Sequence, residues 1–242
     1  MQSMTRFERL SRNIQQQRAR LVTFSAKTFV LDARGVLYMP SQKLLVFSDL
    51  HFEKGSYLAQ FANPLPRWDT ASTIANMQVC LNDYEVSCVL CLGDSLHDQA
   101  AHNRMREEDL KAVQAMVQSV AEWVWVTGNH DPVVPSSMLG ESAHAYCVDD
   151  IQFVHEPLDS ARAEYGYQVI GHYHPKARRK IAGRYFSGKC FLQTPSLLMM
   201  PAFGAYTGGL DITEQAITSL FPPSPDNKVH LMYQQHLYSF AN

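Results

Sequence analysis

Short apolar runs recur along the chain, and several of them stop at a cluster of Asp, Asn or His. The clearest are residues 43–48, 89–92, 123–126, 151–154 and 167–170. Runs of this length without polar alternation are typical of strands that are covered on both faces. We therefore predict buried strands that each end in a polar turn.

Two longer segments, residues 69–84 and 104–121, place apolar side chains on one helical face. They lie between the first three apolar runs, so the order of elements predicts crossover connections and strands that share one carboxyl edge. Open α/β sheets bind ligands at that edge. Ahead of them, residues 28–32 and 35–39 are expected to form a hairpin. After Pro135 the β runs become shorter, which predicts a second sheet packed on the first.

Residues 1–27 are strongly basic, with six Lys and Arg against the single acid Glu8. Their periodicity is weak, so we expect an N-terminal arm that is solvated or frayed, or that contacts nucleic acid or a partner. The chain as a whole is 46% hydrophobic, which suits a full core. Residues 28–242 are accordingly expected to form one α/β domain.

The net charge of −2 gives no global nucleic-acid signature, so a polyanion would need a local patch. The run from Lys176 to Lys180 is the candidate, and a solvated basic turn is its alternative interpretation. Five scattered cysteines, an odd number, favour a reducing compartment and predict a cytoplasmic protein. No apolar run approaches the roughly 18 residues of a membrane span, so no membrane segment is expected.

The polar turns together carry a set of carboxylate, imidazole and amide donors without a thiolate. These blocks are Asp49-x-His51, Gly93-Asp94, Gly128-Asn129-His130-Asp131, His155 and Gly171-His172-x-His174. Such donors suit Mn, Fe or Zn in a reactive site rather than structural zinc. The donors are more than one ion needs, whereas two ions about 3.5 to 4 Å apart, bridged by one carboxylate, would use them all.

This ordered series of blocks, over residues 43–175, resembles the calcineurin-like metallophosphoesterases. A narrower resemblance, to the bacterial ligase-associated DNA damage response endonucleases, is carried by residues 48–56, 93–98, 171–177 and 200–210. The resemblance implies an α/β fold, an αββα sandwich of two packed mixed β-sheets flanked by helices, for a metallophosphoesterase domain at 28–242. It also implies a metal-dependent phosphodiesterase, a nucleic-acid endonuclease linked to DNA repair, with a DNA-repair ligase or helicase as partner.

The resemblance assigns roles position by position. Asp94 would bridge two ions, of which manganese is expected first and iron or zinc are the alternatives. One ion would be held by Asp49, His51, Asp94 and His174, and the other by Asp94, Asn129, His155 and His172. The ions would activate a water for in-line attack on phosphorus. His130 matches the family histidine that protonates the leaving oxygen, and Asn129 would also contact substrate.

One departure concerns the acid that usually orients this histidine. Many relatives have GDxxDR, whereas this chain has His97 and Asp98 at the last two positions. Asp98 or Asp131 could take the orienting role; we expect Asp98 first, with His97 as the next candidate. His97, Lys176, Arg178 and Arg179 are the remaining residues expected to contact substrate.

Several interpretations stay open from the sequence. A phosphodiesterase for small nucleotides and a phosphomonoesterase would share the same metal core. A phosphate-binding scaffold is the non-enzymatic alternative, although the full ligand set favours an enzyme. The glycine-rich run at residues 200–210 is either a wall of the active-site cleft or a loop whose glycines serve backbone shape.

Overall fold

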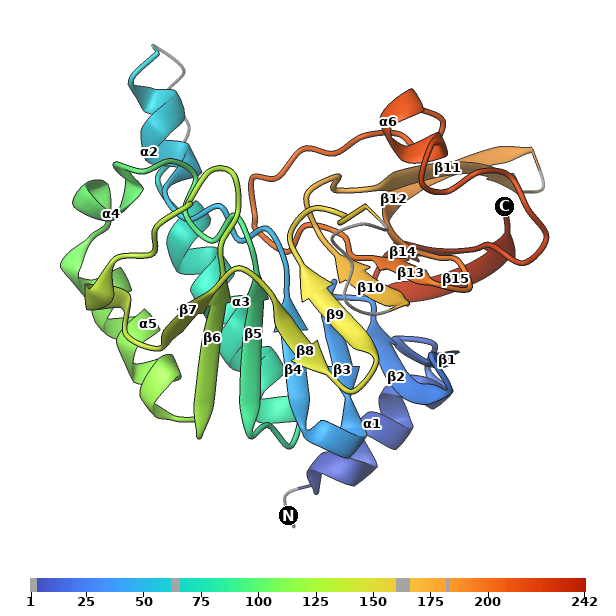
Figure 1. The fold of residues 1–242 in the computed structure, drawn as a ribbon, viewed down its shortest axis with the longest axis horizontal. Helices are drawn as coiled ribbons and strands as arrows, with labels where there is room; N and C mark the ends of the chain where they lie inside the picture. The colour runs from blue at the N-terminus through green and yellow to red at the C-terminus, as the bar shows by residue number, and fades with distance from the viewer. Residues whose placement is uncertain (1–3, 62–65, 160–165, 182) are drawn as a thin grey trace.

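The computed structural model describes residues 4–61, 66–159, 166–181 and 183–242 (Figure 1). The first sheet contains strands in the order of the chain. They are β1 (Ala19–Phe24), β2 (Lys27–Asp32), β3 (Leu37–Met39), β4 (Leu44–Phe47), β5 (Cys88–Leu92), β6 (Glu122–Val126) and β7 (Glu141–Ala143). Strands β1 to β4 pair antiparallel, and β4 to β7 pair parallel, so this sheet is mixed.

The second sheet is also mixed and has the order β15-β14-β12-β13-β10-β9-β8, with β11 paired to β12. The strands are β8 (Tyr146–Val148), β9 (Ile151–Val154), β10 (Tyr167–Ile170), β11 (Lys176–Ile181), β12 (Arg184–Gln193), β13 (Leu197–Met199), β14 (Lys228–Tyr233) and β15 (His236–Ala241). Strand β10 pairs parallel with both β9 and β13. The carboxyl ends of β9 and β10 therefore lie together.

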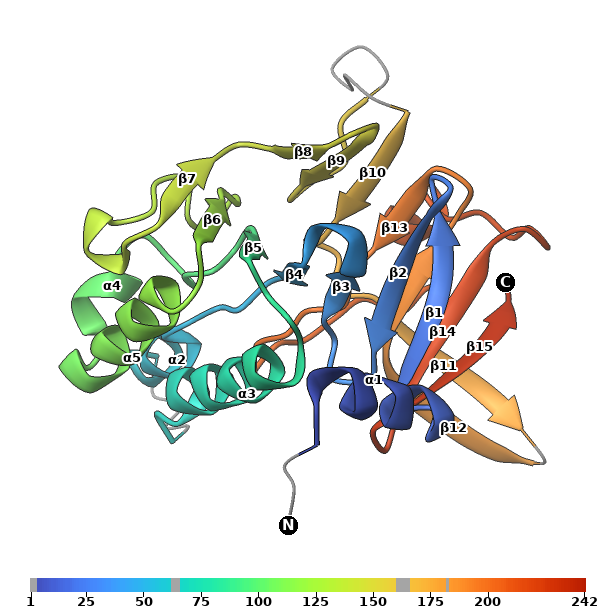
Figure 2. The same ribbon diagram turned by 90° about the horizontal axis from the view of Figure 1, so that it is seen from below.

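The helices cover the outer faces of the two sheets. They are α1 (Arg6–Gln15), α2 (Lys54–Ala59), α3 (Asp69–Asp83), α4 (Ala101–Arg104), α5 (Glu107–Gln118) and α6 (Gln215–Thr218), with 3-10 turns at Pro40–Gln42 and Ser136–Met138. Seen from below, α1, α3 and α5 lie on one side of the first sheet and the second sheet lies on the other (Figure 2).

Three apolar clusters match these layers. One fills the space between the first sheet and α1, α3 and α5, a second lies between the two sheets, and the third covers the outer face of the second sheet around α6. This arrangement confirms the predicted αββα sandwich. The fourth layer is thin, because α6 has only four residues.

The structure changes several predicted boundaries. The second predicted helix begins at Glu107 rather than at 104, after the separate short helix α4. The last apolar stretch, predicted at residues 229–238, is two strands joined at Gln234 and Gln235. Residues 176–180 belong to strand β11, so the alternative interpretation of this run as a basic turn is wrong.

The N-terminal segment also differs from the expected arm at 1–27. Residues 6–15 form α1, whose Leu10 and Ile14 pack on the core of the first sheet. Strand β1 pairs along its whole length with β2. Phe24, at 2% exposure, packs edge-on against Phe29 and against Tyr167 of the second sheet. Most of this segment is therefore integrated into the domain. Within the described residues, no helix combines the length and the apolar character needed to cross a membrane.

The packing of Phe24 gives a stability prediction. Phe24→Ala should lower the free energy of unfolding by about 3 to 5 kcal/mol, because it leaves a cavity between the sheets. Leu21→Ala, on the same strand at 52% exposure, should change it by less than about 0.5 kcal/mol. Urea unfolding measures both, and equal small effects would mean that β1 contributes little to the fold.

Candidate metal centre

Every predicted ligand block follows directly on a strand. Asp49 and His51 follow β4, Asp94 follows β5, Asn129 follows β6, His155 follows β9, and His172 and His174 follow β10. The parallel pairing of β4 with β5, β5 with β6, and β9 with β10 brings these turns to one edge of each sheet. The sequence prediction of a shared ligand edge is confirmed.

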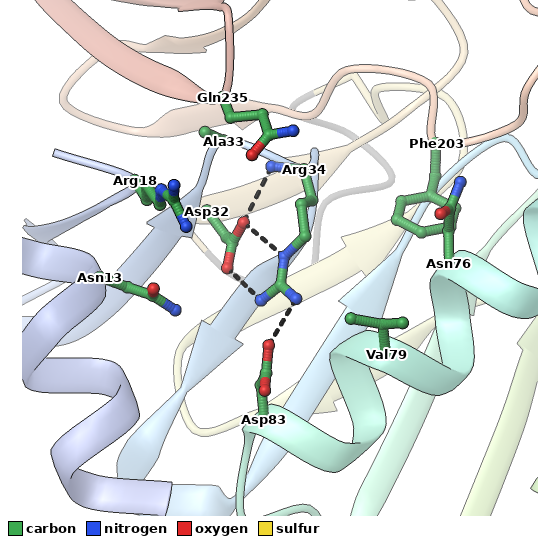
Figure 3. A pocket seen from close by; sticks show the side chains of 10 residues that line it. All are labelled: Asn13, Arg18, Asp32, Ala33, Arg34, Asn76, Val79, Asp83, Phe203 and Gln235. Atoms are coloured by element: carbon green, nitrogen blue, oxygen red, sulfur yellow. Dashed lines mark hydrogen bonds and ion pairs between the residues drawn. The ribbon is translucent and has the colours of Figure 1, made fainter. Parts of the chain in front are cut away.

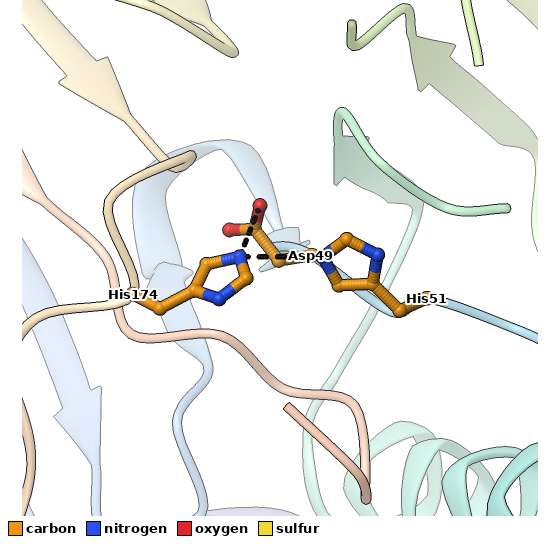
Figure 4. Close-up of side chains that lie close together, drawn as sticks. All are labelled: Asp49, His51 and His174. Carbon is orange, nitrogen blue, oxygen red and sulfur yellow. Dashed lines mark hydrogen bonds and ion pairs between the residues drawn. The ribbon is translucent and has the colours of Figure 1, made fainter. Parts of the chain in front are cut away.

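Asp49, His51 and His174 form the first cluster, which we call ligand group 1 (Figure 4). The three donor atoms lie within 4.8 Å of one another. Nε2 of His174 is 3.0 Å from Oδ1 of Asp49 and 3.3 Å from Nε2 of His51. Asp49 is fully buried. Three donors from two sheets thus converge on one point.

Asp94, His155 and His172 form the second cluster, ligand group 2, within the same 4.8 Å limit. Nε2 of His155 is 3.3 Å from Oδ2 of Asp94 and 3.3 Å from Nδ1 of His172. The amide oxygen of Asn129 lies 3.1 Å from the same His155 nitrogen. Asn129 therefore stands beside group 2 as a further oxygen donor.

The carboxylate of Asp94 lies between the two groups. Its Oδ2 atom is 3.3 Å from His155 in group 2 and 3.9 Å from Nε2 of His51 in group 1. Its other oxygen, Oδ1, accepts the backbone N–H of His130 at 3.0 Å. One oxygen is thus held by the fold, and the other faces both groups.

The carboxylates around group 2 act on the pKa of His155. Burial lowers the pKa of His155, but the hydrogen bond with Asp94 and the nearby carboxylates outweigh it and raise that pKa to about 9. Nδ1 donates to the carbonyl of Leu92 at 3.1 Å, which leaves Nε2 to face Asp94 and Asn129. Nε2 therefore lies at the point where these donors converge. A metal ion and a proton compete for this nitrogen, so the donor set fits a divalent cation.

The ligand residues adopt a backbone conformation that most residues avoid. Asp49, His51, Asp94, His172 and His174 all have positive φ, between 47° and 68°. In both D-x-H and H-x-H the two ligands share this left-handed conformation, which aims their side chains into the site. Each such residue costs of order 1 to 2 kcal/mol, and such strain clusters at functional sites.

Two glycines allow the turns to approach one another. Gly93 has φ of +74°, and a Cβ there would lie 2.1 Å from Nδ1 of His155. A Cβ on Gly171 would lie 2.1 Å from Oγ of Ser48 and 2.7 Å from Oδ2 of Asp49. Any larger residue at either position would displace a candidate ligand.

Asp131 joins two of the ligand turns. Its carboxylate is buried and accepts backbone N–H groups at 2.7 to 3.1 Å, from Gly128, Asp94, Ser95 and Leu96. Burial raises the pKa of Asp131 to about 6, against the lowering effect of these N–H groups. The residue therefore fixes the turn after β5 against the turn after β6.

A sequence model of the calcineurin-like phosphoesterase family matches residues 42–188. The chain belongs to the calcineurin-like phosphoesterase family. The crystal structure of Pseudomonas putida nuclease MPE has the same fold, with a TM-score of 0.70 and 22% identity over 92% of this chain and 100% of that one. A protein of unknown function from Aquifex aeolicus has a TM-score of 0.39 and 18% identity over 54% of this chain and 78% of that one. No curated protein matches this chain.

His130, which is predicted to protonate the leaving oxygen, is held by a backbone carbonyl. Nδ1 of His130 lies 2.8 Å from the carbonyl oxygen of His97 and donates to it. Nε2 then faces the site, 3.9 Å from Oδ2 of Asp94. Neither acid predicted to orient His130 does so in the structure: Asp98 pairs with Arg104, and Asp131 accepts backbone N–H groups.

His97, which was predicted to contact substrate, contacts the candidate metal ligand His51. Its Nδ1 atom is 3.2 Å from Nδ1 of His51, and its ring stacks on His130 with centroids 5.4 Å apart. Burial lowers the pKa of His97 to about 4 and that of His51 to about 3, so both rings are neutral. With Nε2 of His51 turned to group 1, its Nδ1–H donates to His97, which fixes the tautomer of His51.

The residues of the basic run that were predicted to contact substrate differ in exposure and in the face of the strand that they occupy. Lys176 is partly buried, whereas Arg178 and Arg179 are exposed on opposite faces of β11. The guanidinium of Arg179 stacks on Phe240, on the outer side of the second sheet. Arg179 is therefore on the face opposite to that of Lys189, whose side chain contacts the run at 200–210, and its predicted substrate contact is not supported.

Some residues of the centre were missed by sequence reasoning. Glu156 lies 3.4 Å from Nδ1 of His172, and Ser48 donates to Oδ2 of Asp49. Both are immediate neighbours of a predicted ligand, which is the signal that could have found them. Lys189 donates to Ala202 O and Gly204 O at 2.7 and 3.2 Å. The amide of Gly204 in turn donates to Asp49 O, so the run at 200–210 supports the ligand turn.

The structure has a cavity beside the centre and another away from it. One, of about 360 Å³, is lined by Asn129, His155 and Glu156 and so opens beside group 2. The other, of about 500 Å³, lies between α1, α3 and the β2–β3 turn (Figure 3). Its central Arg34 is held by Asp32 and Asp83. No candidate ligand lines this second cavity, so it is separate from the centre.

The His97 contact yields a prediction about metal affinity. His97→Ala should weaken metal binding by roughly 10 to 100-fold, because the Nδ1–H of His51 loses its acceptor. Asp98→Ala, next in the chain but paired with Arg104, should leave metal affinity unchanged. Metal titration of both variants measures the two affinities. A larger loss of metal affinity in Asp98→Ala than in His97→Ala would contradict the role assigned to His97.

Proposed function

We propose that the protein is a dinuclear-metal-dependent phosphodiesterase that hydrolyses nucleic acid. The observation that carries this proposal is the position of Asp94. One of its oxygens faces His155 in group 2 at 3.3 Å and His51 in group 1 at 3.9 Å. A single carboxylate between two donor clusters is the arrangement that a pair of bridged ions requires.

We propose two divalent ions, with manganese first and iron or zinc as alternatives. Group 1 supplies one carboxylate and two imidazoles, and group 2 supplies the same set with the Asn129 amide oxygen beside it. Carboxylate, imidazole and amide donors without thiolate suit these metals. Bound there, the two ions would supply a nucleophile from water at neutral pH and neutralise charge on the phosphate.

The side chains of the protein would carry the proton chemistry. Nδ1 of His130 is fixed by the carbonyl of His97 at 2.8 Å, so Nε2 is the nitrogen available to substrate. We assign to Nε2 the proton that the leaving oxygen takes up. We assign hydrogen bonds to phosphate oxygens to Asn129, which is exposed beside group 2, and to the second ring nitrogen of His97.

Nucleic acid is the substrate class that the remaining observations favour. The similar protein from Pseudomonas putida is a nuclease. In this chain, a strand with four Lys and Arg begins two residues after the candidate ligand His174. The role in DNA repair, the ligase or helicase partner and the cytoplasmic location are proposals that rest on the family resemblance and on the cysteine pattern.

Asp94→Asn tests the shared carboxylate. We expect loss of turnover and weaker binding of both ions, because an amide cannot bridge two cations as a carboxylate does. Asp149→Asn, an exposed Asp in the turn after β8, is the matched control and should behave as wild type. Turnover at saturating metal and metal content per chain are the measurements. Near-normal turnover of Asp94→Asn would contradict a dinuclear centre.

His130→Ala tests the proton donor. Turnover of a substrate with an alkoxide leaving group should fall by roughly 100 to 10,000-fold, with metal content unchanged, because a proton source is lost. A nitrophenolate leaving group needs little protonation, so its hydrolysis should fall much less. Equal losses on the two substrates would argue against this role.

The substrate proposal is tested by a panel with the metal varied. The panel comprises a nitrophenyl monoester, a nitrophenyl diester, a cyclic nucleotide, single-stranded and duplex DNA, and RNA. Metal-dependent cleavage of a polynucleotide well above the cyclic nucleotide and the monoester supports the proposal. Preference for either small substrate would replace it by the corresponding alternative, and absence of any metal-dependent turnover would favour a phosphate-binding scaffold.

A further inference from the structure

The two faces of the β11–β12 hairpin differ in charge and in contacts. Antiparallel pairing sets Lys176 opposite Lys189, Arg178 opposite Ser187 and Lys180 opposite Tyr185. Paired residues share a face, and alternate residues along a strand point to opposite faces. We call the face formed by Lys176, Arg178, Lys180, Tyr185 and Lys189 the cationic face.

The opposite face of the hairpin is occupied by packing. Ala177 is buried at 1% exposure in the outer core of the second sheet. Phe186 packs edge-on against Tyr233, with ring centroids 5.1 Å apart. Arg179 lies over Phe240, its guanidinium carbon 4.8 Å from the ring centroid. The side chains of this face therefore pack against the rest of the domain, and a ligand would bind to the cationic face.

The inner end of the cationic face reaches the candidate metal centre. Lys189 donates to the carbonyls of Ala202 and Gly204. The amide of Gly204 donates at 3.1 Å to the carbonyl of Asp49, a member of group 1. On the neighbouring strand, Lys176 stands two residues after His174. The cationic face thus begins at the turns that hold group 1.

The outer end of this face carries exposed cations that lie against an aromatic ring. Arg178 and Lys180 are exposed, and in the described part of the chain neither pairs with a carboxylate. The guanidinium carbon of Arg178 is 4.0 Å from the ring centroid of Tyr185, and Nζ of Lys180 is 5.6 Å from it. Tyr185 itself is 60% exposed. Their charges are therefore available to an anion.

The shape of the hairpin suits an extended polyanion. In both ribbon views β11 and β12 reach outward past the rest of the second sheet (Figures 1 and 2). At about 3.4 Å per residue, Lys176 to Lys180 spans roughly 14 Å. A nucleic-acid strand carries one phosphate per about 3.4 Å of helix axis, so this span corresponds to about four nucleotides. A small nucleotide is too short to use it.

We propose that the cationic face of the β11–β12 hairpin binds the nucleic-acid strand that extends from the scissile phosphate. Phosphates lie along Arg178 and Lys180, and a base or sugar packs against the exposed ring of Tyr185. This inference rests on the proposed nucleic-acid substrate. It limits the substrate contacts predicted for the basic run to the cationic face. Arg179, on the opposite face, is therefore not assigned a substrate contact.

The matched experiment removes two charges from one face or from the other. Arg178→Ser/Lys180→Ser changes the cationic face, whereas Arg179→Ser/Arg184→Ser removes the same charge from the packed face. For a single-stranded DNA of about twelve nucleotides, the first variant should raise KM about tenfold with kcat unchanged. Its slope of log K against log salt should fall by about 1.4, and that of the control should stay near wild type.

Short substrates and Tyr185 provide two further readouts. Both double variants should hydrolyse a dinucleotide and a nitrophenyl diester at the wild-type rate, because neither substrate reaches the outer hairpin. Tyr185→Leu should raise the KM for the long DNA, and Tyr185→Phe should keep it near wild type, since a phenyl ring retains the stacking surface.

The outcomes separate this surface from the function on which it rests. If wild type cleaves DNA but the two double variants weaken binding equally, or neither does, the assignment of the cationic face is overturned alone. A loss that is as large on the dinucleotide as on the long DNA would also overturn it. Wild type that hydrolyses only the small substrates would overturn the nucleic-acid function and the surface together.

Discussion

The Asp94 carboxylate lies where side chains from two separate sheets meet. Group 1 takes Asp49 and His51 from the first sheet and His174 from the second, and group 2 takes Asp94 from the first and two histidines from the second. The donor distances therefore depend on how the two sheets pack through the apolar cluster between them. Cations bound there would link the sheets, and because the unfolded chain has no such donor set, they would stabilise the folded state.

The ligand turns are costly to form and are held by backbone hydrogen bonds. Five candidate ligands have positive φ, at a cost of order 1 to 2 kcal/mol each. Much of the compensation comes from carboxylates that accept backbone N–H groups. Asp131 accepts four of these bonds, and Asp49 accepts the amide of His172 across the two sheets at 3.2 Å. Asp49 is thus both a candidate ligand and a support for a ligand turn, whereas Asp131, outside both groups, only holds turns in place.

The fold was predictable wherever a strand is buried on both faces, because continuous apolar runs mark such strands. The prediction failed at strands that carry charge. In β1 only Ala19 and Phe24 are buried, and most of the arginines of residues 1–27 lie ahead of it, so the whole segment resembles an arm. In β11, Arg179 occupies the packed face by stacking on Phe240, which removes the alternation of apolar and polar residues. The β14–β15 turn uses Gln234 and Gln235 at positive φ, where glycine or asparagine would have marked it.

Both donor clusters join residues that the family resemblance assigned to the same ion. The order of elements predicted only that these turns share a sheet edge, because the carboxyl ends of parallel strands lie together. The surroundings of His130 were not predictable in the same way. Its partner is the backbone carbonyl of His97. Every residue has such a carbonyl, so the pattern of side chains in the sequence gives no signal for this contact. That carbonyl is in reach because the turn after β5 folds back on the turn after β4, where His51 N–H donates to Asp94 O and His97 N–H to Phe52 O. A carbonyl carries no net charge, so it fixes the imidazole without placing another carboxylate beside it.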